Sequence, residues 1–430
     1  MRFISFRFVR VGLLAVLAAM LLGGSATAAG QKEWLVHSFD GTHGDQPMGN
    51  LIADSAGNLY GTAFQGGAHN WGVVYEMVRP VPPKTAWTEA VLYSFTGGID
   101  GGLPEGGVIF DKSGTLYGTT NRGGVSDAGT VFELMPPVTP GGAWTESLLH
   151  SFTPDSGDGG SPETGLTWDH SGNLIGVTSA GGINRRSACG GICGTVFQLS
   201  PPSTPGGAWT ETILQNFKYG QGIVPRGTPV VAANGTLYGT TYGGGLYGEG
   251  VFYRLTPPSA PGGTWTYRVL HAFTGRFDGQ SPRGALVLRG NGVLYGTSEG
   301  GGAYAGGMVF QFVPPTAPGG TWTENVLYSF GFETGDGGEP AANIIFDSAG
   351  SLYGTTLANG LCSGCGTVFQ LAPPTSSGGD WTGTILHSFG AAKDGPSPSG
   401  GLIFGKNGVL FGVTQAGGSN GEGAVYAITK

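Results

Sequence analysis

Five aspartates of this sequence share one recurring motif, Asp-Gly-x-x-Pro, and their type and spacing could do chemistry. They are Asp100, Asp158, Asp278, Asp336 and Asp394, and His43 and Gln221 stand at the aspartate position in two further copies. Around an axis, such carboxylates could form a partial ring that binds a cation or a sugar. We favour a turn in which each carboxylate caps its own backbone, because the motif recurs whatever its neighbours are. The five remain our candidate binding residues, and we predict no metal site and no cofactor.

The histidines do not indicate catalysis. Four of them share one predicted strand position with other residue types, in the set His37, Tyr93, His150, Gln215, His271, Tyr328 and His387. Exchange with Tyr and Gln indicates packing and not proton transfer. The sequence also lacks Gly-x-Ser-x-Gly, His-Glu-x-x-His and a phosphate-binding glycine loop placed before a helix. We therefore name no catalytic residue.

Four cysteines interrupt the regular pattern in two loops: Cys189, Cys193, Cys362 and Cys365. Their even number, their close pairing and an N-terminal export signal favour two local disulfides, Cys189–Cys193 and Cys362–Cys365. A zinc site would need all four to converge, whereas they lie in units far apart in the repeat. A redox role for the Cys-x-x-Cys pair lacks a thioredoxin-like context.

A tandem repeat must position all of these residues. Its core is the stretch Leu-Tyr-Gly-Thr-Thr at residues 116–120, here called the LYGTT box. Related boxes begin at seven leucines that are 57, 58, 63, 57, 58 and 58 residues apart: Leu59, Leu116, Leu174, Leu237, Leu294, Leu352 and Leu410. Such regular spacing identifies seven copies of one unit. We expect the box to form an inner strand whose glycine allows neighbouring sheets to approach closely.

Each unit contains four short runs rich in β-branched and aromatic residues, which predict four strands. In the second unit they are residues 107–110, 116–120, 129–134 and 144–152. A glycine stands two residues before every box leucine and predicts a tight hairpin with positive φ. Four aspartates stand five residues before a box leucine and should bond the turn backbone, a structural role: Asp54, Asp111, Asp169 and Asp347.

Seven four-stranded antiparallel units predict an all-β, seven-bladed β-propeller. Residues 34–39 resemble the fourth strand of a unit, yet they precede the first unit. Residues 423–428 resemble a third strand with no fourth strand behind it. We therefore expect the N-terminal strand to complete the last blade and close the ring, since an unpaired apolar edge invites aggregation.

The first 28 residues read as a signal peptide, with Arg2, Arg7 and Arg10 before an apolar run and a small-x-small cleavage site. We expect residues 29–430 to form one secreted domain, periplasmic or extracellular, that is free of the membrane after cleavage. The leader holds three of the 20 basic residues, so 17 remain against 28 acidic ones. Because the mature chain has no basic cluster, we expect neither nucleic acid nor an anionic membrane as a partner. We expect a monomer.

The repeat resembles a known family. Residues 100–134 and 336–371 best match a string in which Asp-Gly-x-x-Pro, an Asp-x-x-Gly turn, Leu-Tyr-Gly-Thr-Thr, Gly-Gly and Gly-Thr-Val-Phe follow in order. This string is similar to the GloVer-type tandem repeat of exported bacterial proteins and extends over essentially the whole mature chain. The resemblance implies a propeller-like fold and export, and it brings no catalytic residues.

Antiparallel strands place the uniform turns on one face and the differing loops on the other, here called the variable face. A ligand site is expected there, around the mouth of the central channel. The first hypothesis is a non-catalytic exported module that binds a protein or a carbohydrate. The alternative is a polysaccharide hydrolase or lyase that uses Asp or Glu at the channel mouth.

Overall fold

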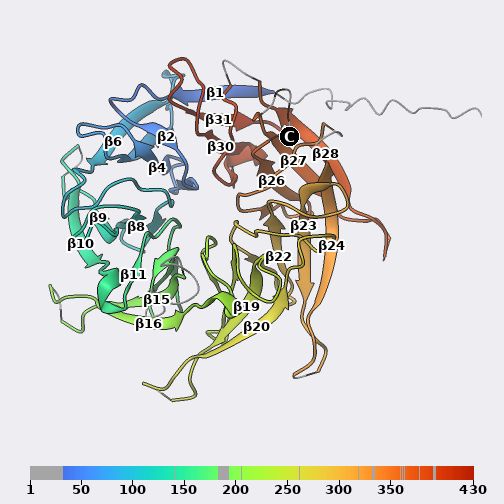
Figure 1. Cartoon of the computed structure of the whole chain (residues 1–430). Coiled ribbons are helices and arrows are strands. Elements are labelled where there is room, and N and C mark those ends of the chain that lie inside the picture. Colours follow the sequence, from blue (N-terminus) through green and yellow to red (C-terminus); the bar gives the residue numbers. More distant parts are fainter. Residues whose placement is uncertain are drawn as a thin grey trace, which may run out of the picture.

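The computed structural model describes residues 32–430, except 140, 183–192, 205, 261, 318, 332–334, 359, 361, 363, 377 and 391–393. Seven antiparallel sheets stand around a ring, which confirms the predicted seven-bladed β-propeller (Figure 1). Three short 3-10 turns are the only helical elements of the described chain: η1 (Pro154–Ser156), η2 (Tyr219–Gln221) and η3 (Lys406–Gly408). None of the helices in this part of the chain is long and apolar enough to span a membrane. The predicted signal peptide lies outside the described residues.

Blades 1 to 3 contain strands β2 to β16. Blade 1 comprises β2 (Asp45–Pro47), β3 (Ile52–Ala53), β4 (Leu59–Gln65), β5 (Val73–Val78) and β6 (Thr88–Ser94). Blade 2 comprises β7 (Ile109–Phe110), β8 (Leu116–Thr120), β9 (Thr130–Met135) and β10 (Thr145–Ser151). Blade 3 comprises β12 (Thr167–Trp168), β13 (Leu174–Thr178), β15 (Thr195–Ser200) and β16 (Thr210–Asn216), and a separate pair is formed by β11 (Gly159–Gly160) and β14 (Ala180–Gly181).

Blades 4 to 7 contain the remaining strands. Blade 4 comprises β17 (Val230–Val231), β18 (Leu237–Thr241), β19 (Val251–Thr256) and β20 (Thr266–Ala272). Blade 5 comprises β21 (Val287–Leu288), β22 (Leu294–Ser298), β23 (Ala305–Val313) and β24 (Thr323–Gly331). Blade 6 comprises β25 (Ile345–Phe346), β26 (Leu352–Thr356), β27 (Thr367–Ala372) and β28 (Thr382–Ser388). Blade 7 comprises β29 (Ile403–Phe404), β30 (Leu410–Thr414), β31 (Ala424–Ile428) and β1 (Glu33–Ser38).

The seventh sheet joins the two ends of the chain. Its strand order is β1-β31-β30-β29, and β1 pairs antiparallel with β31 from Glu33 opposite Ile428 to Ser38 opposite Ala424. In Figure 1, β1 lies beside β31 although nearly 400 residues separate them in sequence. That β1 stabilises the closed ring is a separate prediction, and deletion of residues 34–39 tests it.

The hairpin turns before the LYGTT boxes have the predicted chemistry. The glycine two residues before each box leucine has positive φ in all seven units, from 74° at Gly408 to 93° at Gly57. Asp111 accepts backbone N–H bonds from Ser113 and Thr115 at 2.8 and 2.9 Å, and Asp54, Asp169 and Asp347 make equivalent bonds. The structural role predicted for these aspartates is confirmed.

Each LYGTT glycine makes room for an aromatic ring of its own blade. A Cβ on Gly118 would lie 2.5 Å from Cζ of Phe132, the residue opposite it on β9. The sequence alone predicts that this glycine lets neighbouring sheets approach, and the structure corrects that prediction. The ring that it accommodates then contacts the next sheet, since Phe132 packs edge-on against Phe95 of blade 1 at 5.1 Å.

This aromatic contact repeats around the whole ring. A phenylalanine after the outer strand of one blade meets an aromatic residue of the next blade in seven pairs: Phe39–Tyr75, Phe95–Phe132, Phe152–Phe197, Phe217–Tyr253, Phe273–Phe310, Phe330–Phe369 and Phe389–Tyr426. The centroids are 4.9–5.5 Å apart. Such pairs contribute about 0.5–1.5 kcal/mol each beyond the area they bury.

The first threonine of the box also links blades. Thr119 Oγ1 donates to the carbonyl oxygen of Thr164 at 2.7 Å, and Thr62 donates to that of Gly106 at 2.9 Å. Each bond reaches the segment that leads into the innermost strand of the following blade. The box therefore fixes the inner ends of adjacent blades, which surround the channel.

Candidate functional site

A polar cavity of about 120 Å³ opens at the channel mouth on the variable face. Its wall includes the residue that follows the proline of the Asp-Gly-x-x-Pro position in blades 1 to 7: Met48, Glu105, Glu163, Arg226, Arg283, Ala341 and Ser399. A second set of wall residues comes from just beyond the LYGTT boxes, including Leu357 and Gln415. We define the channel mouth by these residues.

Charge at the channel mouth breaks the sevenfold symmetry. Glu105 and Glu163 come from blades 2 and 3, and Arg226 and Arg283 come from blades 4 and 5. The other three blades supply Met48, Ala341 and Ser399, which carry no charge. Two carboxylates thus face two guanidinium groups on one side of a mouth that is otherwise neutral at this position.

Ion pairs hold the four charged side chains in place. Arg226 Nε lies 3.0 Å from Glu163 Oε2, and Ser179 donates to Glu163 at 2.7 Å. Arg283 reaches Glu299 at 3.1 Å and Glu105 at 3.7 Å. All four charged side chains of the channel mouth are partly exposed. The exposed fraction is 16% for Glu105 and for Glu163, and it is 30% for Arg226. They can therefore contact a ligand from solvent.

The environment of Glu105 raises the proton affinity of its carboxyl group. Burial raises the pKa of Glu105, and the nearby charge of Glu163 adds to the rise, while Arg283, Asn121 and Arg226 oppose it. Asn121 donates to its carboxylate at 3.1 Å. The guanidinium of Arg226 also lies 4.8 Å from the ring centre of Tyr242, a cation–π contact that orients it.

The five motif aspartates cap their own loops, as the favoured interpretation predicted. Backbone N–H groups donate to them at 2.8–3.3 Å, from Thr96 to Asp100, Thr153 to Asp158, Thr274 to Asp278, Gly331 to Asp336 and Gly390 to Asp394. None of the five is among the residues that line the channel mouth. A binding role for them stays a prediction.

The histidine position on the outer strands does more than pack, which corrects our interpretation. His150 Nε2 lies 3.1 Å from Asp158 Oδ2, and Tyr93, His271, Tyr328 and His387 contact their own motif aspartates in the same way. Where glutamine replaces the aspartate, Gln215 bonds Gln221 at 3.3 Å. The position is thus the hydrogen-bonding partner of the motif.

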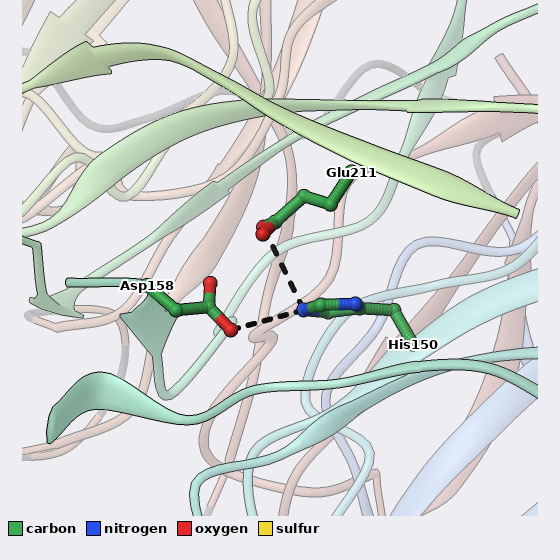
Figure 2. Close-up of side chains that lie close together, drawn as sticks. All are labelled: His150, Asp158 and Glu211. Carbon is green, nitrogen blue, oxygen red and sulfur yellow. Dashed lines mark hydrogen bonds and ion pairs between the residues drawn. The ribbon is translucent and has the colours of Figure 1, made fainter. Parts of the chain in front are cut away.

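A glutamate of the next blade approaches the same group. Figure 2 shows His150 with Asp158 on one side and Glu211 of blade 3 on the other, and His150 Nε2 lies 3.6 Å from Glu211 Oε1. At equivalent strand positions, burial raises the pKa of Glu33 and Glu146 to about 7 and that of Glu211 and Glu324 to about 8. Nearby aspartate charges add to each rise. Polar clusters therefore lie in several seams between blades.

The seam carboxyls predict a pH-dependent stability. A glutamate with a raised folded-state pKa takes up a proton on folding, so its contribution is complete below the usual pKa of 4.5 and is lost as the pH rises through about 7. We expect Glu146→Gln to raise the apparent Tm at about pH 8 by roughly 1–3 °C and to leave it nearly unchanged at about pH 5. Differential scanning fluorimetry at both pH values measures this, with Glu249→Gln, outside the seam clusters, as control. An equal or lower Tm for Glu146→Gln at the higher pH would contradict the argument.

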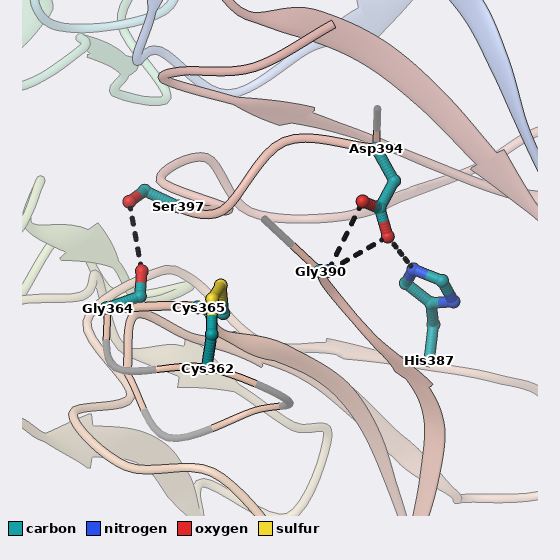
Figure 3. The surroundings of a disulfide bond; sticks show 7 residues. All are labelled: Cys362, Gly364, Cys365, His387, Gly390, Asp394 and Ser397. Atoms are coloured by element: carbon teal, nitrogen blue, oxygen red, sulfur yellow. Dashed lines mark hydrogen bonds and ion pairs between the residues drawn. A yellow bond between two sulfur atoms is a disulfide. The ribbon is translucent and has the colours of Figure 1, made fainter. Parts of the chain in front are cut away.

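One of the two predicted disulfides is present, Cys362–Cys365, with Cα atoms 5.1 Å apart. Figure 3 places it near Gly364, whose carbonyl oxygen accepts a bond from Ser397, and near the His387–Asp394 pair. Cys193 is buried and disulfide-bonded. Its predicted partner, Cys189, lies outside the described residues.

The fold and the site together define a seven-bladed propeller with an asymmetric, charged channel mouth. The chain belongs to the Gloeobacter/Verrucomicrobia repeat family, whose model matches residues 25–203, 187–318 and 316–430. The resemblance seen in the repeat is thereby confirmed. No curated protein matches the chain.

Solved structures share the fold at low sequence identity. The extracellular domain assigned to a hybrid two-component system of B. thetaiotaomicron is 12% identical, with 93% of this chain and 42% of that chain covered and a TM-score of 0.54. PorZ, a surface component of the type-IX secretion system of Porphyromonas gingivalis, is 16% identical, with 91% and 47% covered and a TM-score of 0.50. A luciferin-regenerating enzyme is 11% identical, with 93% and 96% covered and a TM-score of 0.44. These likenesses concern the fold alone.

Proposed function

We propose that this protein is an exported, non-catalytic binding module that holds an acidic carbohydrate at the channel mouth. The observation that carries the proposal is the break in symmetry at one structural position, where Glu105, Glu163, Arg226 and Arg283 replace neutral residues. A repeat that only built a scaffold would have no need for four charges at this place. Charged side chains held in a concave site with partial exposure are suited to binding.

The residue types favour a sugar that carries carboxylates. Guanidinium groups bind carboxylates through paired hydrogen bonds, and carboxylates accept hydrogen bonds from hydroxyl groups. A uronic acid unit offers both groups. The cavity of about 120 Å³ is smaller than the roughly 300–1,000 Å³ of common small-molecule sites, so it suits one unit of a polymer.

Export is supported by the cysteine chemistry and by the leader-like sequence. The Cys362–Cys365 disulfide and the disulfide-bonded Cys193 are typical of proteins that fold in an oxidising compartment. The positive residues and apolar run of residues 1–28 support the same assignment.

We expect Arg226→Gln combined with Arg283→Gln to weaken binding about 10- to 100-fold, since one hydrogen bond to a charged group is worth about 1.5–3 kcal/mol. The mature protein is titrated calorimetrically with a galacturonate oligomer, then with the tightest ligand from a glycan array. The matched control is Arg122→Gln with Arg276→Gln, two exposed arginines of the variable face that do not line the cavity. Equal weakening by both double variants, or by neither, would sink the proposal.

A polysaccharide hydrolase or lyase is the second candidate, favoured by one observation. Glu105 has a raised pKa beside a second carboxyl, Glu163, and such a group can act as a general acid. Release of new reducing ends or unsaturated products from the array ligands distinguishes this candidate. Turnover that is lost in Glu105→Gln would replace binding with catalysis as the function.

A further inference from the structure

Two seams between blades bring a histidine, an aspartate and a glutamate within 4.8 Å of one another, and both lie away from the channel mouth. One group is His150 on β10, Asp158 in the loop that follows, and Glu211 on β16 of the next blade (Figure 2). The other is His271 on β20, Asp278 in the loop that follows, and Glu324 on β24. Each group therefore joins two blades, blade 2 to blade 3 and blade 4 to blade 5.

The spacing of the atoms matches that of ligands around a small cation. His150 Nε2 lies 3.1 Å from Asp158 Oδ2 and 3.6 Å from Glu211 Oε1. His271 Nε2 lies 3.2 Å from Asp278 Oδ2 and 3.4 Å from Glu324 Oε2. In each group all three ligand atoms lie within 4.8 Å of one another. Tetrahedral zinc with bonds of about 2.0–2.1 Å separates its ligand atoms by about 3.3–3.4 Å.

The protein leaves part of each group without a hydrogen-bond donor. Glu211 Oε1 and Glu324 Oε1 are buried and have no hydrogen-bond partner among the described residues. Glu33, Glu89 and Glu146 share this state at the equivalent position of other seams, so the close approach of a histidine and two carboxyl groups distinguishes the two groups. Asp158 and Glu324 are only 8% and 11% exposed as side chains. The one imidazole nitrogen that faces the two carboxyl groups can donate a single proton, so without an ion the glutamate must carry a proton of its own. A divalent cation would neutralise both carboxylates and accept the imidazole as its third ligand.

We propose that His150–Asp158–Glu211 and His271–Asp278–Glu324 each bind a divalent zinc-type cation that clamps neighbouring blades together. One nitrogen and two carboxylate oxygens are three zinc ligands, and water completes the tetrahedron. Calcium is disfavoured because it takes six to eight oxygen ligands. The blades joined in this way supply Glu105 with Glu163 and Arg226 with Arg283 to the channel mouth, so the cations would hold its charged wall in register.

Other seams in the described chain provide comparisons within the molecule. Tyr93 stands at the histidine position between blades 1 and 2, beside Asp100 and Glu146. Between blades 3 and 4 the three positions hold Gln215, Gln221 and Tyr267, and between blades 5 and 6 Tyr328 and Gly383 remove two of the ligands. Each of these seams lacks the histidine, and zinc is not expected to bind there. The seams between blades 6 and 7 and between blades 7 and 1 keep it, with His387, Asp394 and Glu33 in one and His37, His43 and Glu89 in the other. Among the described residues, however, only the groups of His150 and His271 bring three ligand atoms within 4.8 Å of one another.

The test is titration of the chelator-treated mature protein with ZnCl₂ by calorimetry, alongside zinc-edge anomalous diffraction. We expect about two zinc ions per chain, a raised Tm with zinc, and no matching effect of CaCl₂. Glu211→Gln and Glu324→Gln should each reduce the count to about one and together to none, whereas Glu146→Gln should leave it at two. These conservative variants are checked for folding by circular dichroism, and anomalous peaks at the two seams report the sites without any variant. Absence of zinc binding would overturn the proposal, and so would a zinc count that neither Glu211→Gln nor Glu324→Gln changes.

Discussion

Deletion of residues 34–39 is expected to abolish the folded monomer. These residues form most of β1 and include Phe39, which is fully buried and packs against Tyr75 of blade 1 at 5.0 Å. Without them, β31 presents an unpaired and wholly apolar edge, Ala424–Ile428. Loss of one buried phenylalanine alone costs about 3–5 kcal/mol, and the exposed edge adds a template for aggregation.

Size-exclusion chromatography and thermal unfolding measure the effect of this deletion. The variant should elute mainly as aggregate, with an apparent Tm lowered by at least about 10 °C where any folded fraction remains. A chain that starts at Glu33 keeps all of β1 and is the control. A monomer of the deletion variant that melts at the wild-type temperature would show that β1 does not hold the ring closed.

Gly118→Val is expected to have the second largest effect. Its Cβ would meet Phe132 at 2.5 Å and Val108 at 3.1 Å, and both neighbours are fully buried. Because Phe132 also packs against Phe95, moving its ring disturbs the contact between blades 1 and 2. Overpacking of this kind costs about 1–3 kcal/mol, and a branched side chain at such close range belongs at the upper end.

Chemical denaturation measures the free energy of unfolding of Gly118→Val, and Gly290→Val is the control variant. Gly290 is exposed and has no positive φ, and a Cβ at this position would meet no atom within 4 Å. Its substitution should therefore change the free energy of unfolding by no more than about 0.5 kcal/mol. Adding Phe132→Leu to Gly118→Val should recover part of the loss, because the smaller side chain frees the space. Equal stability of the two valine variants would show that the box glycine is not needed for packing.

The architecture was predictable because it depends on local patterns that recur. Seven boxes at a nearly constant spacing, a glycine before each one and short β-rich runs each specify a hairpin through nearby residues alone. The positive φ at Gly57 and the capping by Asp111 follow from turn chemistry. The resemblance to a repeat family depended on the same positions.

Contacts between blades were harder to predict, because the partners are about 60 residues apart and belong to different units. Glu211 approaches His150 only across the seam between blades 2 and 3, which forms when the ring is assembled. One signal for the histidine position did exist in the sequence. Gln215 replaces histidine in the same unit in which Gln221 replaces aspartate, as expected for side chains that bond each other.

The channel mouth was predicted as a region but not as a set of residues. Glu105, Glu163, Arg226 and Arg283 each follow the proline of the recurring motif, and the motif aspartates drew attention away from them. The residue type at this position changes from unit to unit, whereas the flanking residues repeat. Variation at one position of a regular repeat was the available signal, and only the ring geometry shows that the four side chains meet.

Hydrogen exchange of the mature protein, with and without its tightest glycan ligand, tests whether the ligand binds at the channel mouth. We expect slower exchange in peptides containing residues 104–107, 162–165, 225–228 and 282–285, which form the charged wall of the channel mouth. Peptides of the opposite face, such as residues 79–87, should exchange at an unchanged rate. Protection confined to that opposite face, with none at the channel mouth, would show that the ligand binds elsewhere.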